Sequence, residues 1–216
     1  MKIKIISFFN LFFTLFFFNS AFGLDPPNHS VKAKILFNEI YDINISEGNY
    51  KVSAELLLSW DGDINPFLKK FKDNIIHGEK LENFLKEIWH PEFLIFNAEN
   101  PRITHYKTLN VFEGKFQLFE RFDSELSIDA DMPYYPFGDL NLNMDILAFS
   151  GNVNEMEFIP EEILVGHDDN EDLNRRVIKG NWLLDEKKIK SSQMQSLNHG
   201  GEKFSVLISN VNVKHK

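Results

Sequence analysis

Cysteine is absent from this 216-residue sequence. No disulfide can cross-link the chain, so its stability must rest on a packed core. A chain of this length can bury enough apolar surface to do so. The absence of cysteine also suits a bacterial exported protein better than an animal extracellular one, because animal extracellular proteins commonly carry disulfides.

Long hydrophobic runs are scarce, and the one that exists lies at the amino terminus. Residues 1–23 have a basic start, MKIK, an apolar run, IISFFNLFFTLFFF, and a small-residue end, NSAFG. This order predicts a signal peptide cut after Gly23 and an exported protein, periplasmic or secreted. The alternative is an uncleaved membrane anchor, but an apolar run of about 14 residues is short for a membrane span of about 20.

Basic residues are in deficit. Residues 1–23 hold two of the 23 basic residues and no acidic residue, so residues 24–216 keep 21 basic and 32 acidic residues, a formal net charge of −11. Such an acidic chain repels phosphate, which argues against a nucleic-acid partner. We expect residues 24–216 to form one domain, without a further apolar run long enough to span a membrane.

Catalytic signatures are missing as well. The sequence has no HExxH, GxSxG or Walker motif, and its seven histidines have no metal-ligand spacing. An acidic stretch, His167–Asp172, could attract a divalent cation, but it lacks the regular spacing of a calcium loop and is more typical of a solvated charge run. We therefore expect no enzyme activity, no cofactor and no metal site.

What the sequence does contain is alternation. Apolar and polar residues alternate over residues 31–40, 50–60, 115–122 and 140–148, which is typical of half-buried strands. Helical spacing appears only over residues 65–75 and 79–88, with Asn65 as the expected helix cap. Residues 190–202 have no period and end in two glycines, which predicts a flexible loop. The pattern predicts an all-β, immunoglobulin-like β-sandwich of about ten strands with one or two short helices.

Four stretches in order resemble the extracellular ligand-binding domain of pentameric ligand-gated ion channels, especially its cysteine-free prokaryotic members. They are NEIYDINISEGNYKVSAELLLSW (38–60), IWHPEFLIFN (88–97), EGKFQLFERF (113–122) and MPYYPFGDLNLNMDILAF (132–149). The second is similar to the family's Trp-x-Pro-acid motif followed by an aromatic–Asn pair. The fourth is similar to the family's signature loop, here with Tyr135, Pro136 and Phe137.

The sequence departs from the family pattern in the signature loop. Gly138 and Leu140 replace the usual Asp and Gln of that loop. Ile128 and Leu142 stand where eukaryotic members place two cysteines, so packing would have to replace that covalent closure. The family's first membrane helix would begin at the end of this chain, so we expect a ligand-binding domain that has no pore helices among these residues.

The resemblance implies a ligand site between subunits. Phe96, Phe149 and Phe204 match its aromatic walls, with residues 191–201 as a lid. Glu55 and Arg121 of the next subunit would face these aromatics. Aromatic walls bind ammonium groups, so the expected ligand is a small amine or amino-acid-like compound and the expected assembly a homopentamer.

Alternatives remain open for the individual residues and for the whole chain. Phe149 breaks the polar face of its strand, which favours a pocket or subunit contact over a partly covered surface residue. Phe96 fits a pocket wall and ordinary core packing equally well. Glu55 and Arg121 could both be solvated surface residues. The chain could be a free-standing ligand-binding protein, a truncated channel subunit with a membrane channel partner, or a structural or adhesive β-sandwich without a small ligand.

Overall fold

Two β-sheets pack face to face in the computed structural model, which describes residues 29–128, 139–166, 177–196 and 200–216. The strands are β1 (His29–Asn44), β2 (Asn49–Trp60), β3 (Ile75–His77), β4 (Phe93–Ile95), β5 (Ile103–Phe112), β6 (Lys115–Ser127), β7 (Leu140–Ala148), β8 (Met156–Val165), β9 (Trp182–Gln195) and β10 (Lys203–His215). The helices of the described residues are α2 (Asn65–Lys70) and α3 (Gly78–Leu85). The prediction of an all-β sandwich of about ten strands with one or two short helices is confirmed.

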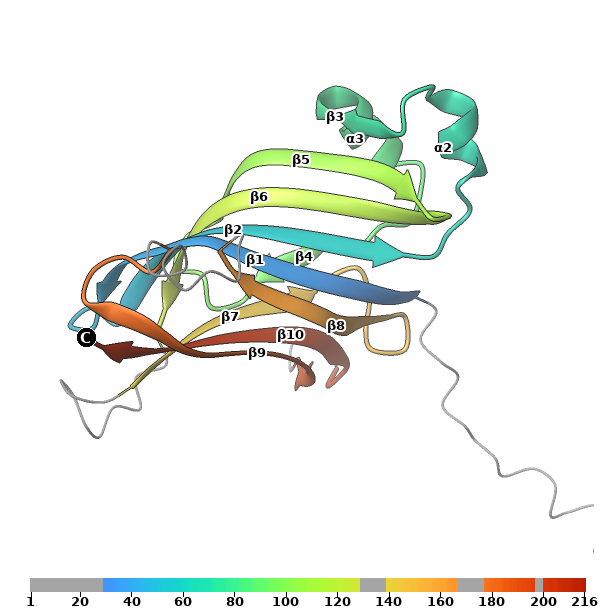
Figure 1. The fold of residues 1–216 in the computed structure, drawn as a ribbon. Coiled ribbons are helices and arrows are strands. Elements are labelled where there is room, and N and C mark those ends of the chain that lie inside the picture. The colour runs from blue at the N-terminus through green and yellow to red at the C-terminus, as the bar shows by residue number, and fades with distance from the viewer. Residues whose placement is uncertain (1–28, 129–138, 167–176, 197–199) are drawn as a thin grey trace, which may run out of the picture.

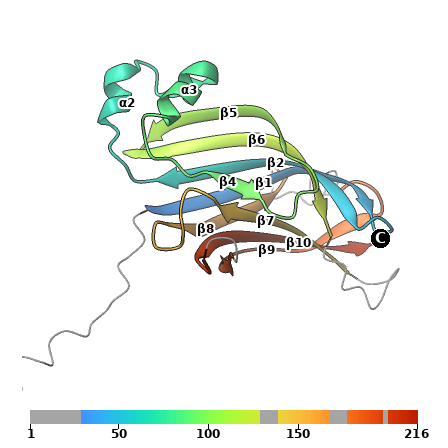
Figure 2. The same cartoon turned by 180° about the vertical axis from the view of Figure 1, so that it is seen from behind.

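One sheet has six strands in the order β3-β5-β6-β2-β1-β8, and the other has four in the order β4-β7-β10-β9 (Figure 1). Strands β1 and β8 pair in parallel, whereas the other pairs are antiparallel. Figure 2 shows β4 beside β7 at the edge of the smaller sheet. Each sheet therefore has an inward face on the core and an outward face that points away from the other sheet.

The first hairpin has the predicted register. Its inward side chains are almost fully buried, and Ile35 of β1 lies opposite Leu56 of β2. Trp60 is also buried and stacks on Phe116 with ring centroids 5.5 Å apart. Strict alternation fixes such a register, because a slip of one residue would turn every apolar side chain outward.

The second hairpin, β5–β6, turns at the predicted Glu-Gly pair. Glu113 and Gly114 both have positive φ, 51° and 78°. Two consecutive residues in this region give the hairpin turn whose twist matches that of the flanking strands.

The helices differ in detail from the prediction. Asn65 is not the cap of α2: Ile64 occupies that position, and Asp63 Oδ1 accepts the Asn65 amide at 3.1 Å. The helix ends at Lys70, so Ile75 does not continue the helical stripe from Phe67 but begins β3 and is exposed. The apolar spacing continues past the helix because Phe71 still packs on Phe67, with ring centroids 5.2 Å apart.

Strand β7 buries one side, as predicted, with Leu140, Leu142, Met144 and Ile146 in the core. Ile128 and Leu142, at the positions of the family's cysteines, are both buried. Buried apolar side chains therefore stand at both positions where eukaryotic members of the family have cysteines.

Two expectations for the last strands are wrong. Strand β9 continues to Gln195, so the first six residues of the expected loop 190–202 belong to an edge strand paired with β10. Polar residues stand on both faces of β9, so this part of the sequence lacks the apolar–polar alternation from which a strand is predicted. The apolar spacing of residues 203–213 changes phase between Ile208 and Val211, which predicts a bulge there; instead Ser209 faces inward and donates a hydrogen bond to the Met144 carbonyl at 3.0 Å. Because Ser209 is polar although it lies in the core, the sequence has the pattern of a register shift at this point. The register shift between β9 and β10 lies instead between Asn212 and Val213.

Candidate functional site

Phe96 follows β4 and is 55% exposed. Its amide donates to the Asp145 carbonyl oxygen at 2.7 Å, which extends the β4–β7 pairing by one residue. Residues alternate across a strand, and Ile95 faces the core, so Phe96 lies on the outward face of the four-stranded sheet. The alternative of ordinary core packing is therefore wrong for Phe96.

Asn97 fixes the backbone next to Phe96. Its Nδ2 donates to the carbonyl oxygens of Asn143, at 2.7 Å, and Ser127, at 3.3 Å. Its Oδ1 accepts the amide of Asp145 at 3.0 Å. One side chain thus joins the end of β6, in one sheet, to β7, in the other. Sequence reasoning quoted the aromatic–Asn pair but assigned Asn97 no role.

Phe149 stands just after β7 and is 59% exposed. Its amide donates to the Glu92 carbonyl at 2.8 Å. Ser150 Oγ accepts the Glu92 amide and donates to the His90 carbonyl at 3.0 Å. These bonds tie the turn after β7 to the segment before β4. The exposure agrees with the sequence argument that Phe149 is not a core residue.

Phe204 lies on β10, opposite Met194 of β9, and is half-buried. In the antiparallel pairing of β10 with β7, Val206 lies opposite Leu147. If that register is extended by two residues, Phe204 lies level with Phe149. The inward residues of β10 are the odd-numbered ones, as the burial of Ser205 and Leu207 shows. Phe204 therefore points outward from the sheet.

We call this outward surface the phenylalanine face; it carries Phe96, Leu147, Phe149, Phe204 and Val206. Leu147 and Val206 are 9% and 7% exposed but lie outside the main core cluster. Their neighbours on the outward face must therefore cover them. By this register Phe204 lies level with Phe149, whereas Phe96 bonds beside Asp145, four residues along β7, so Phe96 stands roughly 13 Å along the strand direction from the other two.

The expected lid is smaller than predicted. Residues 191–195 of the expected lid belong to β9, and beyond them the Gly201 amide donates to the Ser196 carbonyl at 3.0 Å. Gly200 and Gly201 have φ of 64° and 84°, which other residues rarely adopt. Residues 197–199 lie outside the described residues.

Glu55 and Arg121 lie on the other side of the molecule. They are cross-strand neighbours in β2 and β6, on the outward face of the six-stranded sheet. Arg121 Nη1 is 4.0 Å from Glu55 Oε1, and Asn38 Nδ2 donates to the same oxygen at 3.1 Å. Within one chain they cannot meet the phenylalanine face, since the two outward faces point away from each other.

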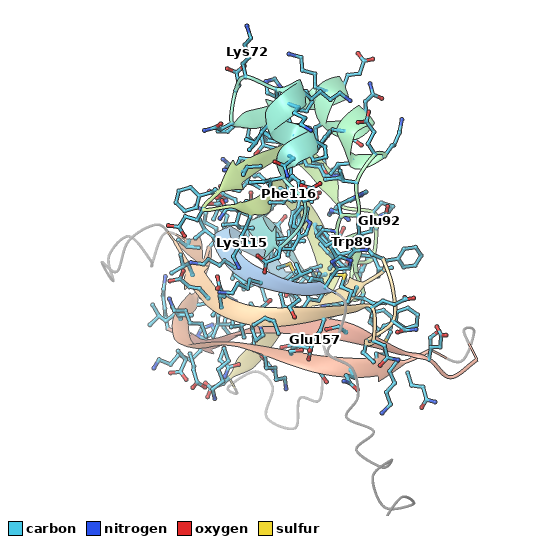
Figure 3. The ribbon with its side chains drawn as sticks, turned by 90° about the vertical axis from the view of Figure 1, so that its right-hand side faces the viewer. Lys72, Trp89, Glu92, Lys115, Phe116 and Glu157 are labelled. Carbon is cyan, nitrogen blue, oxygen red and sulfur yellow. The ribbon has the colours of Figure 1, made fainter. Side chains whose placement is uncertain are left out.

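A cleft of about 510 Å³ opens beside Phe149, between the two sheets at the edge formed by β4 and β5. Phe93, Arg102, Lys107 and Glu120 also line it, whereas Phe96 and Phe204 do not. We call it the Phe149 cleft. Glu92, labelled in Figure 3, is another residue that lines the cleft.

Sequence reasoning missed an ion pair in the Phe149 cleft. Glu120 is only 2% exposed. Its carboxylate accepts Arg102 Nε at 2.7 Å, Arg102 Nη2 at 3.2 Å and Thr104 Oγ1 at 2.7 Å. The guanidinium carbon of Arg102 lies 4.3 Å from the ring centroid of Phe93. The signal was present, because Glu120 interrupts the buried alternation of Phe116, Leu118 and Phe122 in β6.

Among the residues that the structure describes, burial is the main cause of a shifted pKa at His29, Tyr41 and Tyr50. Burial raises the pKa of Tyr50 well above its ordinary value of 10.0, and the protonated hydroxyl donates to the Asn143 carbonyl at 2.6 Å. Partial burial lowers the pKa of His29 from 6.5, where its ring stacks on Trp89 with centroids 3.5 Å apart. The Tyr50 hydroxyl and Asn97 Nδ2 donate to the same acceptor, the Asn143 carbonyl of β7. Both side chains therefore help to hold β7 in position.

Some predictions fall outside the described residues: the signal peptide 1–23, the signature loop with Tyr135, Pro136 and Phe137, and the acidic stretch 167–172. Within the residues that the structure describes, no group of three or more histidine or acidic side chains could hold a metal ion. In the same residues, no helix is long and apolar enough to cross a membrane.

No protein-family model matches the chain, and no curated protein matches it significantly.

Proposed function

We propose that this protein is an exported small-ligand-binding domain that resembles the extracellular domain of pentameric ligand-gated ion channels. The observation that carries the proposal is the phenylalanine face. The resemblance predicts Phe96, Phe149 and Phe204 as pocket walls, and the break in the polar face of β7 points to Phe149 as well; all three lie on one side of the four-stranded sheet, although 108 positions of sequence separate the first from the last.

The second support comes from the position of Glu55 and Arg121. Both lie on the outward face of the six-stranded sheet, opposite the phenylalanine face. A site that combines the two faces therefore needs two copies of the chain, in head-to-tail contact. Repeating such a contact around an axis closes a ring, and we propose a homopentamer.

The proposed ligand is a small amine or amino-acid-like compound. Exposed aromatic rings attract an ammonium group with roughly 0.5–2 kcal/mol per contact. The Glu55 carboxylate of the next copy would contribute a charge partner for the ammonium group, and Arg121 would contribute one for a ligand carboxylate. Because Glu55 and Arg121 lie close together, each partly neutralises the other, which favours a zwitterion over a simple cation.

Isothermal titration calorimetry with a panel of small amines and amino acids tests the proposal. We expect one or more to bind in the micromolar to millimolar range, about −8 to −4 kcal/mol. Phe149→Ala should weaken binding by about 1–3 kcal/mol without unfolding the protein. Phe112→Ala is the matched control, because Phe112 is 55% exposed on a different sheet. If binding is unaffected by Phe149→Ala, the site is elsewhere.

An alternative function is a structural or adhesive β-sandwich without a small ligand. It would be favoured if no compound of the panel bound and the protein remained monomeric at high concentration. The third possibility, a channel subunit that acts with a membrane partner, shares the same ligand site, so the calorimetric test does not depend on it.

A further inference from the structure

A lobe formed by α2, β3 and α3 projects from one end of the six-stranded sheet (Figures 1 and 3). We call residues 64–86 the helical lobe. Its inner side is fixed by an aromatic cluster in which Phe67 contacts Phe71, Phe84 and Phe116, with ring centroids 5.2, 5.5 and 6.3 Å apart. The lobe is thus anchored to the sandwich by side chains that point inward, and its outer residues are not needed for that packing.

Large apolar side chains remain exposed on and beside the lobe. Leu68 of α2 is 51% exposed, Ile75 of β3 is 53% exposed and Phe112 at the end of β5 is 55% exposed. Ile75 pairs with Asn110, and Phe112 follows two residues later on the same face, so the two side chains are diagonal neighbours. Single exposed apolar residues are ordinary, but three at one end of a small protein indicate a contact surface.

The charge of the lobe is opposite to that of the chain. Residues 64–86 contain five lysines and three acidic residues, whereas the whole chain has a formal net charge of −9. Lys69, Lys72 and Lys80 are exposed. None of the three forms an ion pair with any residue in the described part of the chain, whereas Lys70 pairs with Glu87. Three basic groups are therefore available beside the exposed apolar side chains.

We propose that the outer tip of the helical lobe docks on an anionic lipid surface. Leu68, Ile75 and Phe112 would enter the headgroup region, while the lysine ammonium groups lie at the level of the lipid phosphates. Long lysine side chains can cover apolar surface while their charged ends reach toward phosphate. Lys72 stands at the far end of the lobe in Figure 3, as a first contact with a charged surface requires.

The shape of the lobe favours a lipid over a protein partner. A specific protein interface buries roughly 800 Å² on each partner and needs a complementary surface. Here short elements form a protruding tip whose apolar side chains come from separate elements. A fluid headgroup layer adapts to such a tip without a matching shape, and its negative charge complements the lysines. The contact lies on different elements from the phenylalanine face and does not depend on the proposed function.

Co-sedimentation with lipid vesicles tests the inference. Residues 24–216 are used, because the described core begins at Val31 and the apolar amino terminus would itself bind lipid. We expect the protein to sediment with vesicles of equal parts phosphatidylcholine and phosphatidylglycerol, and roughly tenfold less with phosphatidylcholine alone. The double variant Lys69→Glu/Lys72→Glu and the variant Leu68→Asp should each reduce binding to anionic vesicles roughly tenfold or more.

Two controls make the test specific. Lys187→Glu/Lys190→Glu changes the same number of charges on the exposed strand β9, and Ile103→Asp makes the same kind of change at a residue that is 65% exposed. Both should bind vesicles as the wild type does. The inference is wrong if the wild type does not sediment with anionic vesicles, or if the lobe variants and the control variants lose vesicle binding equally. Self-association abolished by Leu68→Asp, without vesicle binding, would assign the tip to a second copy instead.

Discussion

Arg102 donates two hydrogen bonds to the buried carboxylate of Glu120, at the edge of the cleft that Phe149 also lines. The arginine is partly exposed, with 25% of its side chain accessible, whereas the glutamate side chain is 2% accessible. The pair joins the segment before β5 to the inward face of β6. It therefore fixes the wall of the cleft on which Phe93 and Phe149 lie.

Glu120→Gln should reduce the free energy of unfolding by about 3 kcal/mol, because Arg102 would keep its charge and lose its counter-ion. Urea denaturation monitored by tryptophan fluorescence measures the effect. The control Glu82→Gln changes an exposed glutamate of the same cleft, 3.9 Å from Lys107, and should cost less than about 0.5 kcal/mol. The double variant Arg102→Met/Glu120→Leu should recover most of the loss. Equal effects of Glu120→Gln and Glu82→Gln would contradict this role for the pair.

Asn97→Ala should destabilise the protein by about 2–3 kcal/mol, because it removes the side-chain partner of the Asp145 amide and of the Ser127 carbonyl and one of the two donors to the Asn143 carbonyl. Thermal unfolding followed by circular dichroism is a suitable measurement. The matched control is Asn100→Ala, an exposed asparagine three residues along the chain, which should change stability by less than about 0.5 kcal/mol. If Asn97→Ala melts at the wild-type temperature, the side chain does not hold the two sheets together.

His29 should make the fold less stable as the pH falls. Its pKa is lowered in the folded state by partial burial, so the unfolded chain binds a proton at a higher pH than the folded chain does. Stability from this group is complete above pH 6.5 and decreases as the pH falls through 6.5 toward the folded-state pKa. His29→Phe can retain the stack on Trp89 and does not titrate. The difference in unfolding free energy between the variant and the wild type should therefore grow in favour of the variant between pH 7 and pH 5. A difference that is independent of pH would show that His29 does not contribute.

Much of the fold follows from the sequence, because alternation of apolar and polar residues fixes which side of a strand faces the core. Strands β1, β2, β6 and β7 follow this rule, and their inward residues were identified in advance. The prediction failed where apolar and polar residues do not alternate. Strand β9 is an edge strand in which polar residues outnumber apolar ones after Leu184, and Ser209 is a core residue whose hydroxyl donates to a backbone carbonyl.

The candidate site shows the same division. Phe149 could be singled out because an aromatic side chain interrupts the polar face of β7. The contributions of Asn97 and Arg102 depend on hydrogen bonds between segments that only the folded chain brings together. Trp89 closes an apolar run, which predicts a core residue; it is only half-buried, because it lies at the edge of the sandwich between His29 and Trp60.

The central claim is that one ligand site is shared by two copies of the chain. Calorimetric titration of a binding amine into a refolded equal mixture of Phe149→Ala and Glu55→Gln subunits tests it most directly. Each variant alone should bind weakly. In a randomly mixed ring, sites of wild-type affinity should reappear in about a quarter of the positions, because each such site needs an intact Phe149 from one copy and an intact Glu55 from its neighbour. A mixture that binds no better than the two variants separately would contradict a shared site.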